Sequence, residues 1–158
     1  MPGDAGRRWG WHPLRPDWAA RIVAESPLRR GDVVIDLGAG DGALTRPLAD
    51  AGARVLAVEL HPRRAAALRD LRWPGHPYRV VANPPYDGVN ALVRSLLRDR
   101  HLLSADLVVA EGAARGLVRR APASRVALEL GPRVPRSAFR HRPPGDARVL
   151  RLRPRRPS

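Results

Sequence analysis

Short apolar runs alternate with amphipathic segments along this chain of 158 residues. The runs are rich in valine, leucine and alanine and end at glycine, proline or charged residues, which is typical of buried strands. They predict six strands, at residues 33–37, 54–59, 78–82, 105–110, 125–130 and 148–153. The amphipathic segments predict helices at residues 17–26, 43–51, 61–73, 89–100 and 111–120. Strands that alternate with helices predict a single α/β domain on a mostly parallel, doubly wound sheet.

The first strand runs into a glycine-rich turn. Residues 36–42 read Asp-Leu-Gly-Ala-Gly-Asp-Gly, and glycines let the backbone approach a ligand closely before the next helix. Glu59 stands at the end of the second strand, where a carboxylate can accept hydrogen bonds from both hydroxyls of a ribose. The turn and the acid together predict a cofactor that contains a nucleoside.

The spacing of these glycines favours S-adenosylmethionine over a dinucleotide. The dinucleotide fingerprint is GxGxxG, whereas Gly38, Gly40 and Gly42 follow GxGxG. Asp36 would repel a pyrophosphate, but it is compatible with the ammonium and sulfonium groups of S-adenosylmethionine. We therefore expect Asp36, Gly38, Gly40 and Glu59 to bind this cofactor.

The sequence Asn83-Pro84-Pro85-Tyr86 follows the third strand, at the edge of the sheet where α/β proteins bind ligands. The Asn83 amide oxygen and the Pro84 carbonyl could hold both hydrogens of an adenine amine and direct its lone pair at a methyl donor. The prolines fix the turn that carries these acceptors. Tyr86 offers a face on which an extruded base can stack. We predict that Asn83, Pro84 and Tyr86 are catalytic, and that no general base is needed.

The net charge is strongly positive and unevenly distributed. All 29 basic residues are arginines, against 15 acidic residues, which gives a net charge of +14. Residues 31–100 hold 10 arginines and 8 acids, whereas residues 101–158 hold 13 arginines and 4 acids. Guanidinium groups bind phosphates in a bidentate manner and stack on bases. The second half is therefore expected to contact a polyanion, although a merely solvated basic surface is the alternative.

The composition also narrows the class of protein. The absence of cysteine excludes disulfides, thiolate zinc sites and cysteine nucleophiles, and we expect no metal site. No apolar run approaches the ~20 residues that span a bilayer, and there is no secretory signal. We expect a monomeric, cytoplasmic protein that does not contact membranes. Residues 1–8 and the basic tail 154–158 are expected to be disordered around a domain at 9–153.

Five stretches carry a resemblance to a known family: WGWHPL at 9–14, IDLGAGDGALT at 35–45, VELHPRR at 58–64, RVVANPPY at 79–86 and SADLVV at 104–109. The chain resembles the Erm-type 23S rRNA adenine-N6 methyltransferases, in a short actinobacterial or mycobacterial-like form. The resemblance implies a Rossmann-like, S-adenosylmethionine-dependent enzyme that methylates an adenine of 23S rRNA, naked or in an assembling ribosomal particle. Such a modification confers resistance to macrolide-class antibiotics.

The resemblance also implies positions for the cofactor contacts. His12 and Leu14 correspond to the N-terminal segment that touches S-adenosylmethionine in this family, and Gly38, Glu59 and Asn83 correspond to its other cofactor contacts. His12 replaces an asparagine that is common there, so a packed histidine without a ligand is an equal alternative.

Two features depart from the family. Full-length members end in a helical RNA-binding domain, and this chain resembles a shorter subgroup without that domain. The N-terminal segment and the arginines of the second half would then bind RNA. Trp9 and Trp11 could stack on bases or anchor the N-terminal arm. The candidate arginines are Arg133, Arg136, Arg140, Arg142, Arg148, Arg151, Arg153, Arg155 and Arg156.

The second departure is a missing strand. Family members have another strand before the NPPY sequence, the usual third, which ends in an acid that binds the cofactor's adenine. Only residues 74–77 separate the second helix from the strand at 78, so that strand and its acid are missing. To remain right-handed, the shortened connection must cross the face of the sheet opposite the first crossover helix. A catalytically impaired RNA-binding relative is therefore one alternative, and an N6-adenine DNA or protein glutamine methyltransferase is another.

Overall fold

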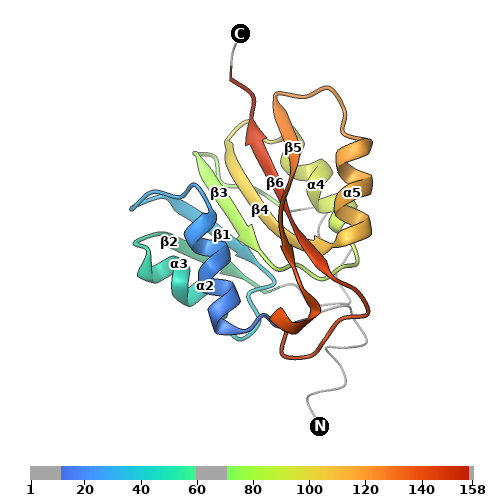
Figure 1. Cartoon of the computed structure of the whole chain (residues 1–158). Helices are drawn as coiled ribbons and strands as arrows, with labels where there is room; N and C mark the ends of the chain where they lie inside the picture. Colours follow the sequence, from blue (N-terminus) through green and yellow to red (C-terminus); the bar gives the residue numbers. More distant parts are fainter. Residues whose placement is uncertain (1–11, 60–70, 157–158) are drawn as a thin grey trace.

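A computed structural model describes residues 12–59 and 71–156 of the chain. Six strands form one sheet in the order β2-β1-β3-β4-β6-β5 (Figure 1). The strands are β1 (Val33–Leu37), β2 (Arg54–Val58), β3 (Tyr78–Ala82), β4 (Leu102–Ala110), β5 (Val126–Val134) and β6 (Ala147–Pro154). β2, β1, β3 and β4 run parallel, and β6 pairs antiparallel with both β4 and β5. The predicted α/β architecture with a mostly parallel sheet is confirmed.

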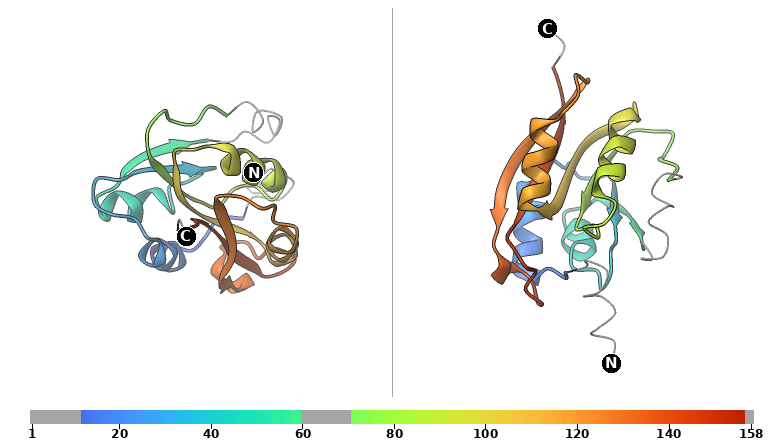
Figure 2. Two further views of the ribbon diagram at one scale, coloured as in Figure 1. Left: turned by 90° about the horizontal axis from the view of Figure 1, so that it is seen from above. Right: turned by 90° about the vertical axis from the view of Figure 1, so that its right-hand side faces the viewer.

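Helices cover both faces of the sheet, as the right-hand view of Figure 2 shows. Buried residues of α2 (Pro16–Glu25) and α3 (Thr45–Asp50) pack with Val34, Val81 and Val108 on one face. α4 (Val89–Arg98) and α5 (Glu111–Arg119) pack with the alternate strand residues on the other. Because successive strand side chains point to opposite faces, each parallel strand contributes to both cores. No helix in the described ranges is long and apolar enough to cross a membrane.

β2 is the edge strand of the sheet, so no described strand continues the sheet beyond it, and β1 pairs with β2 on one side and with β3 on the other. Within the described residues, the family's usual third strand is therefore missing, as predicted. Leu71 and Trp73, at the end of the connection from β2 to β3, pack with the core on the α4 side. The Trp73 ring stacks on Tyr78 with 5.6 Å between centroids, and its indole N–H donates to Ser95 Oγ at 2.9 Å.

These contacts place the end of the connection on the face opposite α3. That is the arrangement which keeps a crossover right-handed when the chain reverses its direction through the sheet. Most of the helix predicted at 61–73 lies outside the described residues. Its last three residues, 71–73, are not helical, which corrects the predicted C-terminal boundary. A helix that ended at Trp73 would leave only residues 74–77 to reach the start of β3 at Tyr78.

The antiparallel strands are longer than the sequence predicted. β5 continues through Gly131 and Pro132 to Val134, with a register shift between Leu130 and Arg133. A Cβ atom on Gly131 would lie 2.9 Å from the Val149 carbonyl oxygen, so glycine allows the bulge to pack against β6. β6 extends to Pro154, one residue past the boundary expected at Arg153. The Arg155 N–H then donates to the Arg125 carbonyl at 2.7 Å. The segment predicted to be disordered at 1–8 lies outside the described residues.

Candidate active site

The carboxyl ends of β1, β2 and β3 bring the sequence motifs together. Leu37 pairs with Val58 at the ends of β1 and β2, and the Gly38 N–H donates to the Val58 carbonyl at 2.7 Å. Glu59 therefore follows beside the glycine turn, with an exposed side chain. Asn83 follows β3 on the other side of β1. The parallel register alone thus gathers the predicted cofactor and catalytic groups at one edge of the sheet.

Gly38 marks the closest contact between the two motifs. Its φ angle is +71°, a conformation that side chains disfavour. A Cβ atom at this position would lie 3.3 Å from Pro85 Cδ and 3.6 Å from the Asn83 carbonyl oxygen. Gly40 and Gly42 also have positive φ angles, of +54° and +85°. The glycine turn is therefore built to pass close to the NPPY turn.

A small cavity lies between the glycine turn, the N-terminal segment and the NPPY turn. Its lining residues are Pro13, Leu14, Asp36, Gly38, Ala39, Asp41, Ala43, Leu44 and Asn83. Four of the predicted cofactor residues thus face one space: Leu14, Asp36, Gly38 and Asn83. Gly40 lies within the turn between Ala39 and Asp41, and Glu59 lies at the end of β2 outside this cavity. His12 is not in the lining either.

Asp36 is a buried carboxylate with one unpartnered oxygen. Its side chain ends β1 facing α3, and Thr45 Oγ1 donates to Asp36 Oδ2 at 2.7 Å. Asp36 Oδ1 has no hydrogen-bond partner, although the residue is 1% exposed. Burial raises the pKa of Asp36 to about 6, and the bond from Thr45 opposes that rise. A buried acceptor of this kind fits a cationic ligand in the adjoining cavity, such as the ammonium of S-adenosylmethionine.

The Asn83 side chain is held in a defined orientation. Its Nδ2 donates to the His12 carbonyl oxygen at 2.7 Å, and the residue is 7% exposed. Because the amide nitrogen is bound there, the amide oxygen Oδ1 points elsewhere, and no described residue donates to it. Asn83, which the sequence predicts to be catalytic, therefore retains a free acceptor beside this small cavity.

Aromatic rings enclose the same corner of the site. The His12 ring lies 5.4 Å from the Tyr86 ring and 6.3 Å from the Phe139 ring, between centroids. Burial lowers the pKa of His12, and it raises the pKa of Tyr86 to about 12. Both side chains are therefore uncharged near neutral pH. They contribute shape and hydrogen-bonding groups to this corner, and no charge.

Phe139 belongs to a contact that the sequence did not reveal. Leu14 forms an antiparallel bridge with Phe139, next to the 3₁₀ turn η2 (Arg136–Ala138). The Arg140 N–H donates to the Pro13 carbonyl at 2.9 Å, and the Arg15 N–H donates to the Ala138 carbonyl at 2.8 Å. These bonds fix the segment that carries the His12 carbonyl. The one sequence feature that distinguishes Phe139 is that it is the only phenylalanine of the chain.

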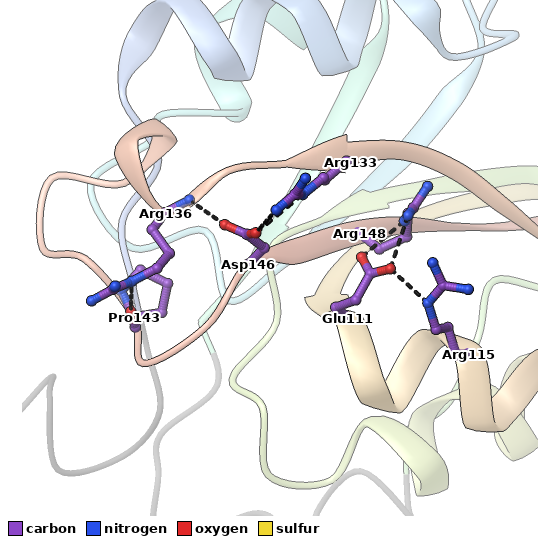
Figure 3. A network of polar contacts seen from close by, with 7 residues as sticks. All are labelled: Glu111, Arg115, Arg133, Arg136, Pro143, Asp146 and Arg148. Carbon is purple, nitrogen blue, oxygen red and sulfur yellow. Dashed lines mark hydrogen bonds and ion pairs between the residues drawn. The ribbon is translucent and has the colours of Figure 1, made fainter.

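Several arginines assigned to RNA bind the protein itself (Figure 3). Arg148 donates two hydrogen bonds to Glu111, at 2.9 and 2.8 Å, and Arg115 donates a third at 2.8 Å. Arg133 pairs with Asp146, whose other oxygen accepts the Arg136 N–H at 3.0 Å. The pair of Arg148 with Glu111 holds β6 against the start of α5, and the pair of Arg133 with Asp146 closes the β5–β6 hairpin.

A second group pairs with the buried Asp106. Arg153 Nη2 donates to Asp106 Oδ1 at 2.8 Å, and Arg151 lies 3.7 Å from the same oxygen. Five of the nine candidates are exposed and have no side-chain hydrogen bond to a carboxylate other than that of Arg140 to Asp41: Arg136, Arg140, Arg142, Arg155 and Arg156. Of these, Arg136 and Arg155 donate to the backbone carbonyls of Pro143 and Ser124. Trp9 and Trp11 lie outside the described residues. The structure therefore narrows the arginines that are free to meet RNA.

Comparison with solved structures defines the class of protein. The chain superposes on the crystal structure of the 23S rRNA methyltransferase ErmE with a TM-score of 0.75 and 29% identity. The match covers 90% of this chain and 70% of that chain. The sheet order, the glycine turn and this match define a Rossmann-like domain of the S-adenosylmethionine-dependent methyltransferases.

Sequence comparison identifies the family within this class. A family model described as ribosomal RNA adenine dimethylase matches residues 15–77. A probable ribosomal RNA small subunit methyltransferase A of Pyrobaculum islandicum is 30% identical over 96% of this chain and 74% of that protein. An rRNA adenine N-6-methyltransferase of Corynebacterium diphtheriae is 31% identical over 76% of this chain and 57% of that protein. The chain belongs to the ribosomal RNA adenine dimethylase family. It spans about half the length of the curated relatives that it matches first.

Proposed function

We propose that this protein transfers a methyl group from S-adenosylmethionine to the N6 amine of an adenine in 23S rRNA. The observation that carries the proposal is the orientation of Asn83, whose amide nitrogen is bound by the His12 carbonyl. Its amide oxygen is left as an acceptor beside the cavity that Asp36 and Gly38 line. An amine that donates to this oxygen would be held next to the methyl donor.

The chain's own groups are suited to orienting the amine. The Asn83 amide oxygen and the Pro84 carbonyl can accept its two hydrogens, which frees the nitrogen lone pair for attack. When bound, S-adenosylmethionine supplies an electrophilic methyl group on a sulfonium sulfur. The nitrogen–carbon bond forms as the carbon–sulfur bond breaks, and the amine proton then passes to water. Burial lowers the pKa of His12, which makes its imidazole a weak base, and this supports release of the amine proton to water.

The bound base needs an aromatic surface and a defined pocket. Tyr86 is half-buried beside His12, whose ring also packs against Phe139, and it offers its ring as a stacking surface. Burial of the hydroxyl leaves Tyr86 Oη without a hydrogen-bond partner among the described residues. These features support an extruded base as the substrate.

The choice of 23S rRNA rests on the resemblance of the motifs and on the match to ErmE. The relative from Pyrobaculum islandicum favours a second candidate, an adenine of the small-subunit RNA. Methylation of 23S rRNA at the peptidyl-transferase region would block macrolide binding. We therefore propose that expression of this chain raises the macrolide tolerance of a sensitive host, as in the Erm-type enzymes.

The experiment that tests the proposed function offers radiolabelled S-adenosylmethionine with purified 23S or 16S rRNA, each naked or in ribosomal particles. Label in 23S rRNA, recovered as N6-methyladenosine after nuclease digestion, is the expected result. Label in 16S rRNA would favour the second candidate. RNA binding without label would indicate the catalytically impaired relative, and label in DNA or protein would indicate another substrate class.

Asn83→Ala is the variant that tests the catalytic assignment. It should reduce methyl transfer by a factor of at least about 10², the usual loss for an acceptor or donor aligned with the transition state. Its affinity for rRNA should stay close to that of the wild type. Asn90→Ala, an exposed asparagine on α4, is the matched control. Wild-type turnover in the Asn83 variant would contradict the assignment.

A further inference from the structure

The small cavity lined by Asp36, Gly38 and Asn83 is the one that the proposed function assigns to the cofactor, and we call it the cofactor cavity. A groove between α2 and α3 continues outward from it. It has a volume of about 400 Å³, and its walls include Pro16, Arg46 and Arg140. Asp41 and Ala43 line both the groove and the cofactor cavity, so the two spaces share a boundary at the glycine turn. The chemistry of this boundary is set by an ion pair between Asp41 and Arg140.

The Asp41–Arg140 pair is fixed at both ends. Arg140 Nη1 donates to Asp41 Oδ2 at 2.8 Å, and the Ala43 N–H donates to Asp41 Oδ1 at 3.3 Å. The Arg140 backbone is held by its bond to the Pro13 carbonyl. The Arg140 side chain is 50% exposed and the Asp41 side chain is 37% exposed, so both are accessible to a ligand. A guanidinium has five N–H donors, and the pair uses one of those on Arg140.

The charged side chains that line the cofactor cavity are all acidic. Its described lining includes the carboxylates of Asp36 and Asp41, but no arginine or histidine side chain. The methionine part of S-adenosylmethionine carries an ammonium and a carboxylate. The cavity can satisfy the ammonium, whereas its own lining offers the carboxylate no cationic side chain. Arg140, bound to Asp41 at the boundary, is the cation in position to do so.

We propose that Asp41 and Arg140 form a clamp for the zwitterionic end of the cofactor. The Asp41 carboxylate binds the ammonium together with the unpartnered Asp36 Oδ1, and the Arg140 guanidinium binds the carboxylate of the cofactor. Two opposed ion pairs arranged head to tail satisfy all four charges, and Arg140 keeps its bond to Asp41. This inference rests on the proposed function, because it takes S-adenosylmethionine as the ligand.

The test compares S-adenosylmethionine with decarboxylated S-adenosylmethionine, which keeps the amine and the sulfonium. Calorimetry of the full chain should show that the wild type binds the carboxylated form at least about tenfold more tightly, the effect of one hydrogen bond to a charged group. Arg140→Ala should bind the two ligands with affinities that differ by less than about twofold. Asp41→Asn should weaken both ligands to a similar extent, because both carry the ammonium.

Arg142→Ala is the matched control, since Arg142 is an exposed arginine two residues further along the same segment. It should keep the wild-type ratio of affinities. Thermal melts check that each variant is folded. An unchanged ratio in Arg140→Ala would overturn the clamp, and so would loss of the ratio in Arg46→Ala instead. An Arg140→Ala variant that loses rRNA affinity but keeps the ratio would assign Arg140 to an RNA phosphate. If the wild type binds neither ligand, the proposed function itself fails.

Discussion

Gly38 provides a test of how closely the glycine turn must approach the NPPY turn. Its φ angle is +71°, and placing a side chain in that conformation costs about 1–2 kcal/mol. In Gly38→Ala the new methyl group would also meet Pro85 Cδ at 3.3 Å, a tight contact against a rigid ring. The variant should therefore lose more stability than the backbone strain alone explains. It should also narrow the cavity that Gly38 and Asn83 line.

Gly31→Ala separates the two effects. Gly31 has a φ angle of +87°, but a Cβ atom there would have no neighbour within 4 Å. Both variants therefore carry similar backbone strain, and only Gly38→Ala crowds the site. For a domain of this size, the strain should lower Tm by about 3–8 °C in each variant. The Tm of Gly38→Ala should fall further, because its new methyl group also crowds Pro85.

Calorimetry with S-adenosylmethionine completes this test. Gly31→Ala should bind with the wild-type Kd, because Gly31 lies at the opposite end of β1 from the glycine turn. Gly38→Ala should bind at least about tenfold more weakly, equivalent to about 1.4 kcal/mol. Equal Tm and equal Kd in the two variants would refute the argument that close packing of the two turns shapes the site.

Two further predictions concern Asp36 and Phe139. Burial raises the pKa of Asp36 to about 6. Between about pH 4 and 6 the folded state therefore keeps a proton that the unfolded state releases. Over this range the free energy of unfolding should fall by up to about 3 kcal/mol. Urea titrations should show a smaller fall in Asp36→Asn, and calorimetry should show S-adenosylmethionine binding more tightly above pH 6; an identical pH profile in the variant would exclude Asp36 as the source. Phe139→Ala should cost about 3–5 kcal/mol, since the ring is 2% exposed, whereas Leu130→Ala, at 37% exposure, should cost far less. Similar losses in both would mean that Phe139 does not anchor the N-terminal segment.

Among the strands that are buried on both faces, the sequence predicted β1 and β3 well, whereas β4 begins at Leu102, three residues before the expected start. The boundaries of β1 and β3 agree with the expected residues 33–37 and 78–82, because such strands are short apolar runs with polar or glycine ends. The antiparallel strands were predicted less well. β5 extends past Leu130 through a Gly-Pro pair that ordinarily ends a strand, and its pairing with β6 depends on a bulge that no local pattern indicates.

The sequence also predicted that the motifs would lie near one another, since motifs that follow parallel strands must meet at one edge of the sheet. Asp36, Gly38 and Asn83 come together for this reason. For His12 the sequence left two alternatives, a cofactor contact or a packed histidine, and its ring packs with Tyr86 outside the cavity lining. The hydrogen bond from Asn83 to the His12 carbonyl was not predicted. A backbone contact of this kind depends on where the N-terminal segment docks.

The sequence by itself therefore determined the fold class and the missing strand, because local patterns and motif order specify them. Only the tertiary structure decided the face on which Trp73 packs, the bridge between Leu14 and Phe139, and the pairing of Arg140 with Asp41. It also decided that Arg148 and Arg153 bind carboxylates of the protein itself. Each of these contacts joins residues far apart in the chain, and its energy exists only once the sheet has brought them together.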